Sequence, residues 1–129
     1  MLARPQKPIV VFDLDGTLVD TAPDLIATLN IVLSEDGIPE VPFAVARPMI
    51  GNGVRPLIER ALAEQERYPG EAAVDAMFAR YIRHYQDHIA DRSRPYPGLH
   101  AALDRLDAGG LALAVCTNKY EALSVRLLD

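Results

Sequence analysis

The sequence predicts an α/β fold in which a small parallel sheet is interrupted by a long helical insertion. Two short, continuous apolar runs, residues 8–12 and 111–115, are typical of buried strands. Between them, residues 20–94 show apolar side chains recurring at helical spacing and no further strand pattern. This order, a strand, a helical block and then helix, strand and helix, is expected of an α/β core that carries an insertion.

The first expected helix begins near residue 21, directly after the first strand and its loop. Thr21 is a suitable N-cap, Asp24 favours the positive end of the helix, and Gly37 closes it. Several prolines and glycines in residues 41–53 predict a short helix and then a loop at 49–53. A second helix is expected over residues 54–63.

The longest helix is expected over residues 71–90, where one wide face is apolar and includes Tyr81 and Tyr85. Residues 94–98 break this pattern, and an amphipathic helix from Leu99 to the Gly109 turn leads into the second strand. A final helix is expected over residues 120–128.

Composition restricts the class of protein. The chain has 129 residues, of which 50% are hydrophobic and 24% charged, as in one globular domain. A formal net charge of -5 with scattered basic residues predicts no nucleic-acid partner, and no apolar stretch approaches the roughly 20 residues that span a bilayer. A single cysteine, Cys116, and the lack of a signal-peptide pattern in residues 1–7 predict a cytoplasmic protein.

The chemistry is concentrated in the loop after the first strand. Asp13 lies at the carboxyl end of this strand, where open α/β sheets bind ligands, and a carboxylate there can attack phosphorus if a cation such as Mg²⁺ screens the charge. If the strand geometry continues, Asp15 is expected on the same side, where it is suited to general acid and base catalysis. Gly16 permits a tight turn, and Thr17 offers a hydroxyl and an amide to phosphate. An ordinary acidic turn is the alternative.

Residues 12–20, FDLDGTLVD, resemble the first signature motif of the haloacid dehalogenase-like hydrolases over its whole length. The resemblance implies that Asp13 is the nucleophile and a Mg²⁺ ligand, and that Asp15 is the acid and base and binds Mg²⁺ through its main-chain carbonyl. It also implies a partial Rossmann-like parallel-sheet core, residues 1–19 and 95–129, interrupted by a helical cap domain, residues 20–94.

Two further segments resemble the phosphoglycolate phosphatase-like subfamily. Residues 116–119, CTNK, follow the second strand, so Thr117 is expected to hold the phosphoryl group and Asn118 to line the pocket, although Thr117 is alternatively a helix cap. Residues 50–54 resemble the substrate-facing loop of the cap, which includes Gly51 and Asn52. Arg55 then either pairs with a substrate carboxylate or phosphate, or is an exposed arginine at a helix start.

The family's later motifs, a lysine and an acidic pair, have no match in this chain, and Lys119 lies too close to Thr117 to replace that lysine. We therefore expect a fragment of a phosphatase for a small phosphorylated metabolite, with 2-phosphoglycolate the expected substrate, that alone binds Mg²⁺ weakly and turns over little. The alternatives are a β-phosphoglucomutase-like mutase and a non-catalytic fragment that self-associates through an exposed sheet edge.

Other polar residues are expected to be structural. His84 and His88 have metal-binding spacing but no acidic or cysteine partner pattern, and His88 shares the apolar face of its helix. Tyr81 and Tyr85 are expected in the core of the cap. We expect Cys116 to be a buried thiol and His100 a surface residue.

Overall fold

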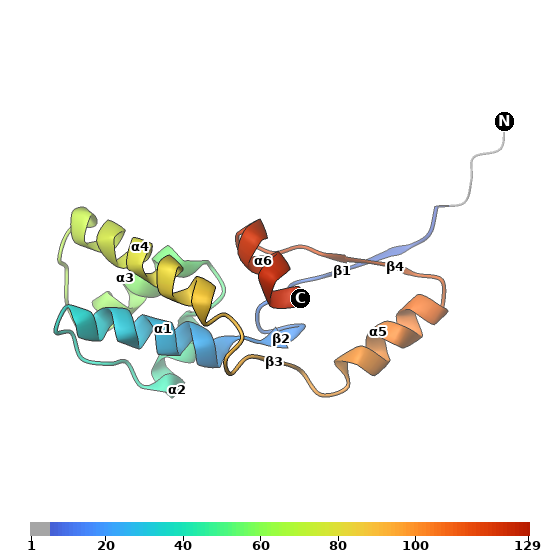
Figure 1. Cartoon of the computed structure of the whole chain (residues 1–129), viewed down its shortest axis with the longest axis horizontal. Helices are drawn as coiled ribbons and strands as arrows, with labels where there is room; N and C mark the ends of the chain where they lie inside the picture. The colour runs from blue at the N-terminus through green and yellow to red at the C-terminus, as the bar shows by residue number, and fades with distance from the viewer. Residues whose placement is uncertain (1–5) are drawn as a thin grey trace.

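The computed structural model describes residues 6–129 as an α/β protein with helices at one end and a small sheet at the other (Figure 1). Two predictions include residues 1–5: that they belong to the α/β core, and that residues 1–7 have no signal-peptide pattern. For residues 1–5, both predictions lie outside the described residues. The elements in chain order are β1 (Ile9–Phe12), β2 (Val19–Asp20), α1 (Ala22–Glu35), α2 (Phe43–Ala46), the 3-10 helix η1 (Arg47–Met49), α3 (Val54–Glu64), α4 (Glu71–Asp87), β3 (Arg94–Pro95), α5 (Leu99–Ala108), β4 (Ala112–Val115) and α6 (Glu121–Leu128).

The two predicted strands pair in parallel, as the sequence analysis expected. Ile9 is opposite Ala112 and Phe12 is opposite Val115, so β1 and β4 end at the same edge. The Cys116 N–H donates to the Phe12 carbonyl at 2.7 Å and extends this pairing by one bond. The loops that follow the two strands, which hold most of the expected catalytic groups, therefore begin side by side.

A second, two-stranded ladder lies where the chain enters and leaves the helical block, which we define as α1 to α4. β2 and β3 pair antiparallel, with Val19 opposite Pro95 and Asp20 opposite Arg94. This ladder was not predicted because two residues are too few to show a periodic pattern and Pro95 opposes a strand assignment. The division into core and cap domains, with boundaries at these positions, stays a prediction.

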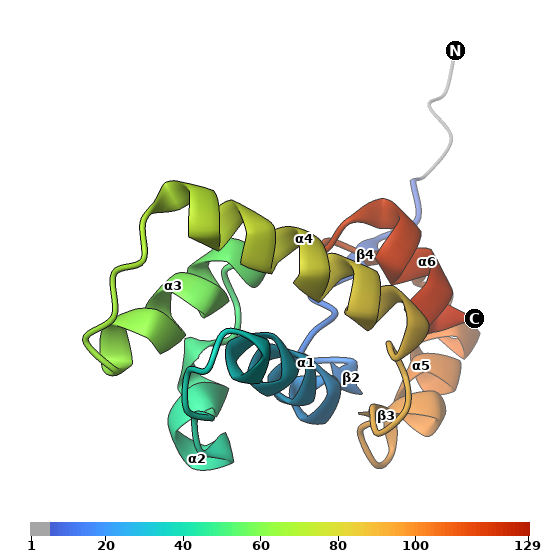
Figure 2. The same cartoon turned by 60° about the vertical axis from the view of Figure 1, so that its left-hand side comes forward.

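The helical block contains the main hydrophobic core. The long helices α1 and α4 pack against each other, and α3 packs on α4 (Figure 2). The Tyr81 hydroxyl donates to the Leu25 carbonyl at 2.8 Å, which satisfies a polar group in a fully buried environment. Tyr81 and Tyr85 are both buried, as predicted. The other fully enclosed apolar side chains of this block include Leu29, Val32, Leu33, Leu57, Ile58 and Met77.

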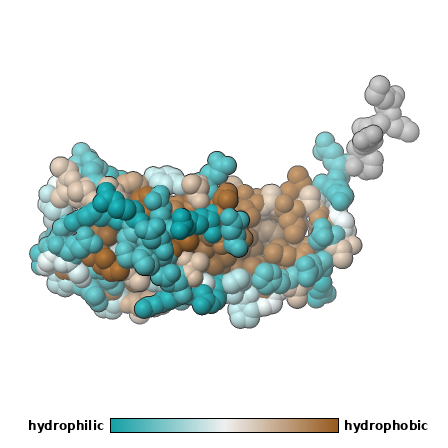
Figure 3. All heavy atoms as spheres, in the orientation of Figure 1, coloured by the Kyte–Doolittle hydropathy of each residue, from teal (hydrophilic) through white to brown (hydrophobic). Residues whose placement is uncertain are grey.

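The sheet differs from the expectation of buried strands. Ile9 and Val11 are 64% and 59% exposed, and Leu113 and Val115 are exposed as well. Apolar atoms gather over this part of the molecule (Figure 3). The prediction of burial was wrong because only β1 and β4 pair here among the described residues, and α5 and α6 leave strand side chains uncovered.

Four smaller expectations can be compared with the structure. Cys116 is exposed rather than buried, because the strand that precedes it is uncovered. His88 does not pack in the apolar core: it follows the last residue of α4, turns toward solvent and forms an ion pair with Asp91 at 2.7 Å. Thr21 is the N-cap residue of α1, but its hydroxyl makes no capping bond. His100 is exposed, as expected.

Candidate active site

The turn after β1 presents two carboxyl groups. The Leu14 N–H donates to Asp13 Oδ1 at 2.8 Å, and the Thr17 and Leu18 amides donate to the Leu14 carbonyl at 3.2 and 3.0 Å. Gly16 has a φ of 77°, a conformation that favours glycine, so the tight exit expected from the sequence is present. Leu14 is fully buried and anchors the turn between the two aspartates.

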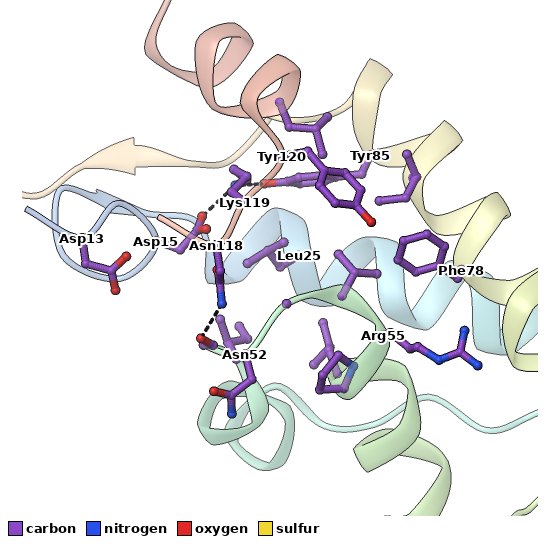
Figure 4. A pocket seen from close by; sticks show the side chains of 18 residues that line it. Asp13, Asp15, Leu25, Asn52, Arg55, Phe78, Tyr85, Asn118, Lys119 and Tyr120 are labelled. Carbon is purple, nitrogen blue, oxygen red and sulfur yellow. Dashed lines mark hydrogen bonds and ion pairs between the residues drawn. The ribbon is translucent and has the colours of Figure 1, made fainter. Parts of the chain in front are cut away.

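Asp15 forms an ion pair across the molecule. Lys119 Nζ lies 2.7 Å from Asp15 Oδ1 and donates to the Tyr85 hydroxyl oxygen at 2.8 Å, as Figure 4 shows. The side chains of Lys119 and Asp15 are only 5% and 15% exposed. The loop after β4 is therefore connected both to the loop after β1 and to α4 of the helical block.

A second contact joins the loop after β4 to the loop before α3. The Asn118 side-chain amide donates to the Gly51 carbonyl at 3.0 Å, so the loop after β4 also contacts the loop before α3 (Figure 4). Asn52, with its amide oxygen turned toward Arg60, accepts a bond of 2.6 Å from that guanidinium. Asn118 and Lys119, which are consecutive residues of the loop after β4, thus bond to two different parts of the helical block.

These contacts surround a cavity of about 270 Å³. Six of the site residues expected from the sequence line it: Asp13, Asp15, Gly51, Asn52, Arg55 and Asn118. Much of the remaining wall is apolar or aromatic, from Leu25, Ile50, Val54, Leu57, Phe78, Ile82, Tyr120 and Leu123. The cavity lies between the carboxylates of the β1 loop and the helical block, and its size suits a small ligand.

Three expected residues do not line this cavity. Gly16 and Thr17 are exposed at the tip of the turn. The Thr117 hydroxyl accepts the Lys119 N–H at 3.1 Å and lies on a neighbouring shallow hollow. It is not the alternative helix cap, since α6 has Tyr120 as its N-cap residue.

Arg55 lines the cavity, but acidic neighbours hold its charged end. The guanidinium donates to Asp75 on α4 and lies 3.1 Å from Glu59. In Figure 4 it points away from Asp13 and Asp15. The structure thus gives Arg55 an ion pair between α3 and α4.

Burial shapes the electrostatics of the Lys119 contact. Desolvation lowers the pKa of Lys119, while the charge and hydrogen bond of Asp15 oppose that change. Burial raises the pKa of the Tyr85 phenol, and the nearby Asp15 adds to the effect, so Tyr85 is a neutral hydroxyl. A buried ammonium held by one carboxylate and one phenol is therefore the main cationic feature beside the acidic turn.

Sequence reasoning did not find Lys119 and Tyr85 as site residues. Tyr85 belonged to the apolar face of its helix, and Lys119 was considered only as a replacement for the missing family lysine. A usable signal existed, since Lys119 directly follows two expected site residues on a strand-end loop. The pairing itself joins positions 104 residues apart and has no local pattern.

The residues present fit a magnesium ion. Mg²⁺ is usually held by one or two carboxylates together with water and substrate phosphate. Asp13 and Asp15 supply two carboxyl groups to one cavity. In residues 6–129, no cluster of three or more His, Cys, Asp or Glu side chains has metal-binding geometry.

Comparison with known proteins gives a consistent result. The family model of the haloacid dehalogenase-like hydrolases matches residues 10–129. Phosphoglycolate phosphatases from Agrobacterium fabrum and Mesorhizobium japonicum are 45% and 47% identical over 100% and 95% of this chain. A crystal structure described as a predicted phosphoglycolate phosphatase from Haemophilus somnus superposes with a TM-score of 0.79 at 30% identity, over 92% of this chain and 56% of that one.

The chain spans about half the length of the curated relatives it matches, 55% and 54% for the two above. Among the described residues, no helix is long and apolar enough to cross a bilayer.

Proposed function

Since this chain belongs to the haloacid dehalogenase-like hydrolases, we propose that it is the nucleophile-bearing part of a magnesium-dependent phosphatase for a small phosphorylated metabolite, with 2-phosphoglycolate the expected substrate. The observation that carries the proposal is the shared cavity of Asp13 and Asp15, enclosed by the helical block. The helical block acts as the cap that excludes water and selects the substrate.

In the first step, an Asp13 carboxylate oxygen attacks phosphorus while the bond from phosphorus to the ester oxygen breaks. Asp15, protonated for this step on the oxygen that does not accept from Lys119, gives its proton to the ester oxygen, so the leaving group departs as a neutral alcohol. In the second step, Asp15 takes a proton from a water molecule that attacks the Asp13 acyl phosphate. Inorganic phosphate leaves, and both carboxyl groups return to their starting states.

Several groups of this chain support those steps. The Asp13 carboxylate and the Asp15 carbonyl would hold Mg²⁺, which supplies the positive charge that lets an anionic nucleophile approach an anionic phosphate. The Gly16 and Thr17 amides already donate to the Val19 and Leu14 carbonyls, so the hydroxyls of Thr17 and Thr117 are proposed to bind the transferring group. Asn118 joins the cap loop to the core through its bond to Gly51.

The test is phosphate release from 2-phosphoglycolate in the presence of Mg²⁺. It compares this chain with a chimera that continues it with the C-terminal part of the Agrobacterium fabrum relative. We expect little release from the chain alone, release from the chimera, and a loss of at least about 100-fold in the Asp13→Asn chimera. Asp104→Asn, on the exposed face of α5, is the matched control and keeps its activity.

Two results would change the proposal. Isomerisation of a sugar phosphate without phosphate release favours a β-phosphoglucomutase-like mutase. An active Asp13→Asn chimera rejects Asp13 as the nucleophile.

A second candidate role is self-association. The exposed Ile9 and Val11 of β1 favour it, since uncovered strands present apolar side chains to a second copy. Sedimentation at increasing concentration measures it, and a monomer at all concentrations excludes it.

A further inference from the structure

We propose that Lys119, together with Tyr85, is a specificity-determining pair that binds the carboxylate of the proposed substrate. This inference rests on the proposed phosphatase function and deepens it. The sequence analysis expected Arg55 as one candidate for binding the substrate carboxylate. The present proposal assigns that role to Lys119 in the loop after β4.

The first argument is an unused pair of donors. The Lys119 ammonium has three N–H groups, and its hydrogen bonds to Asp15 and Tyr85 use two of them. The Tyr85 oxygen accepts from Lys119, while its own hydrogen has no acceptor among the hydrogen bonds of the described residues. Both side chains line the cavity, so two buried donors are available to an anionic ligand group.

The second argument is the distribution of charge around the cavity. Lys119 and Arg55 are the two basic side chains in its wall. Asp75 and Glu59 already pair with Arg55, whose guanidinium points away from the catalytic carboxylates (Figure 4). Most other side chains of the wall are apolar and give a second anionic group of the substrate no partner. Lys119 is thus the cation best placed for it.

The third argument is position. Lys119 Nζ lies 2.7 Å from Asp15 Oδ1, the group that protonates the leaving oxygen in the proposed mechanism. In a phosphorylated 2-hydroxy acid, the carboxylate carbon is only two covalent bonds from that oxygen. A leaving group held by Asp15 therefore brings its carboxylate within reach of the remaining Lys119 N–H and the Tyr85 hydroxyl. A sugar phosphate has no carboxylate at this position.

Burial determines the size of the effect. The Lys119 side chain is 5% exposed, so water competes little for its remaining donor. A hydrogen bond to a charged group in such a site changes affinity by on the order of tenfold or more. The expected preference for a carboxylated ester over a neutral one is of that order.

The experiment measures binding to the 129-residue chain by titration calorimetry with Mg²⁺ present. The two probes are 2-phosphoglycolate and 2-hydroxyethyl phosphate, in which a hydroxyl group replaces the carboxylate. The wild-type chain should prefer 2-phosphoglycolate by about tenfold or more. Lys119→Met should remove this preference, because the variant has no ammonium group to bind the substrate carboxylate.

Three further variants make the test specific. Lys7→Met makes the same change at an exposed position away from the cavity and keeps the preference. Tyr85→Phe removes one donor and lowers the preference by part of the Lys119 effect. Lys119→Arg retains the charge and should keep a measurable preference for 2-phosphoglycolate. This variant provides the test if circular dichroism shows that Lys119→Met does not fold.

Equal wild-type affinity for the two esters, or no binding of either, overturns the proposal. So does a preference that survives Lys119→Met or that Arg55→Met abolishes instead. The phosphatase function is tested separately, by phosphate release from the chimera and its loss in the Asp13→Asn variant. That test does not depend on which residue binds the substrate carboxylate.

Discussion

The helical block and the sheet segment, β1 with β4, differ in how they hold their side chains. The block encloses residues such as Leu29 and Tyr81 completely, whereas Ile9 and Val11 of the sheet are 64% and 59% exposed. The site combines both parts, because its carboxylates follow the exposed strand and much of its wall belongs to the enclosed helices. Packing of the block therefore shapes the cavity, while the turn that carries Asp13 and Asp15 depends on the small buried cluster of Leu14, Leu18 and Val19.

The largest effect should come from the core of the helical block. Leu29→Ala removes a fully buried side chain and should lower the free energy of unfolding by about 3 kcal/mol, because it leaves a cavity between packed helices. Val11→Ala, on the exposed face of β1, should change it by no more than about 0.5 kcal/mol. Urea unfolding followed by circular dichroism measures both. Equal effects would contradict the comparison.

The next effect concerns the junction at which the chain leaves the helical block, where α1 contacts the residues before β3. The Asp24 carboxylate, 3% exposed, accepts the Arg92 N–H at 2.9 Å and both the N–H and hydroxyl of Ser93 at 2.7 and 2.6 Å. Asp24→Ala leaves these donors without partners and should cost about 2 kcal/mol of unfolding free energy. Hydrogen exchange should accelerate at Arg92 and Ser93.

The exposed Asp91→Ala is the control for that junction and should leave the exchange of Ser93 unchanged. Unaltered exchange in Asp24→Ala would show that the buried carboxylate does not hold the junction.

A smaller, pH-dependent effect is expected within the block. Burial raises the pKa of Tyr81 well above its ordinary value of 10.0. Because the pKa of Tyr81 is higher in the folded than in the unfolded protein, its contribution to the unfolding free energy is complete below pH 10.0. This contribution is lost as the pH rises above that value. The unfolding free energy should fall above about pH 10 by about 1.4 kcal/mol per pH unit from this group. Unfolding curves at alkaline pH measure this slope.

Tyr81→Phe should remove its share of that slope. The 80% exposed Tyr68 provides the control, and Tyr68→Phe should keep the wild-type slope. Identical slopes in the wild type and Tyr81→Phe would contradict the assignment.

The smallest effect is expected at the surface of the block. Arg80 donates to both Asp36 oxygens at 2.9 and 2.7 Å, and this hydrogen bonding lowers the pKa of Asp36. Because both side chains are partly exposed, Arg80→Met should cost at most about 1 kcal/mol. A lowered folded-state pKa means that the stabilisation is present above the ordinary value of 3.8 and is lost as the pH falls through the lower value.

Wild-type and Arg80→Met stabilities, measured by thermal unfolding, should therefore converge at acidic pH. Arg83→Met, at an exposed position of the same helix, is the control. A constant difference at every pH would show that packing, rather than the ion pair, causes the loss.

The sequence was most informative where the signal is local. Helical spacing predicted α1, α3 and α4, two apolar runs predicted β1 and β4, and the order of residues predicted that Asp13 and Asp15 follow a strand. Burial of the strands was not predictable, since it depends on which other layers cover them. The pairs of Lys119 with Asp15 and Arg55 with Asp75 join distant positions and required the fold.

Detection of an acyl phosphate on Asp13 tests the proposed role of this chain most directly. The chimera is mixed with 2-phosphoglycolate and Mg²⁺, quenched in acid, and digested for mass spectrometry, with Asp13→Asn as the control. We predict a phosphoryl group on Asp13 in the parent chimera alone. Phosphate release without a phosphoryl group on Asp13, or with one on another residue, would contradict the proposal.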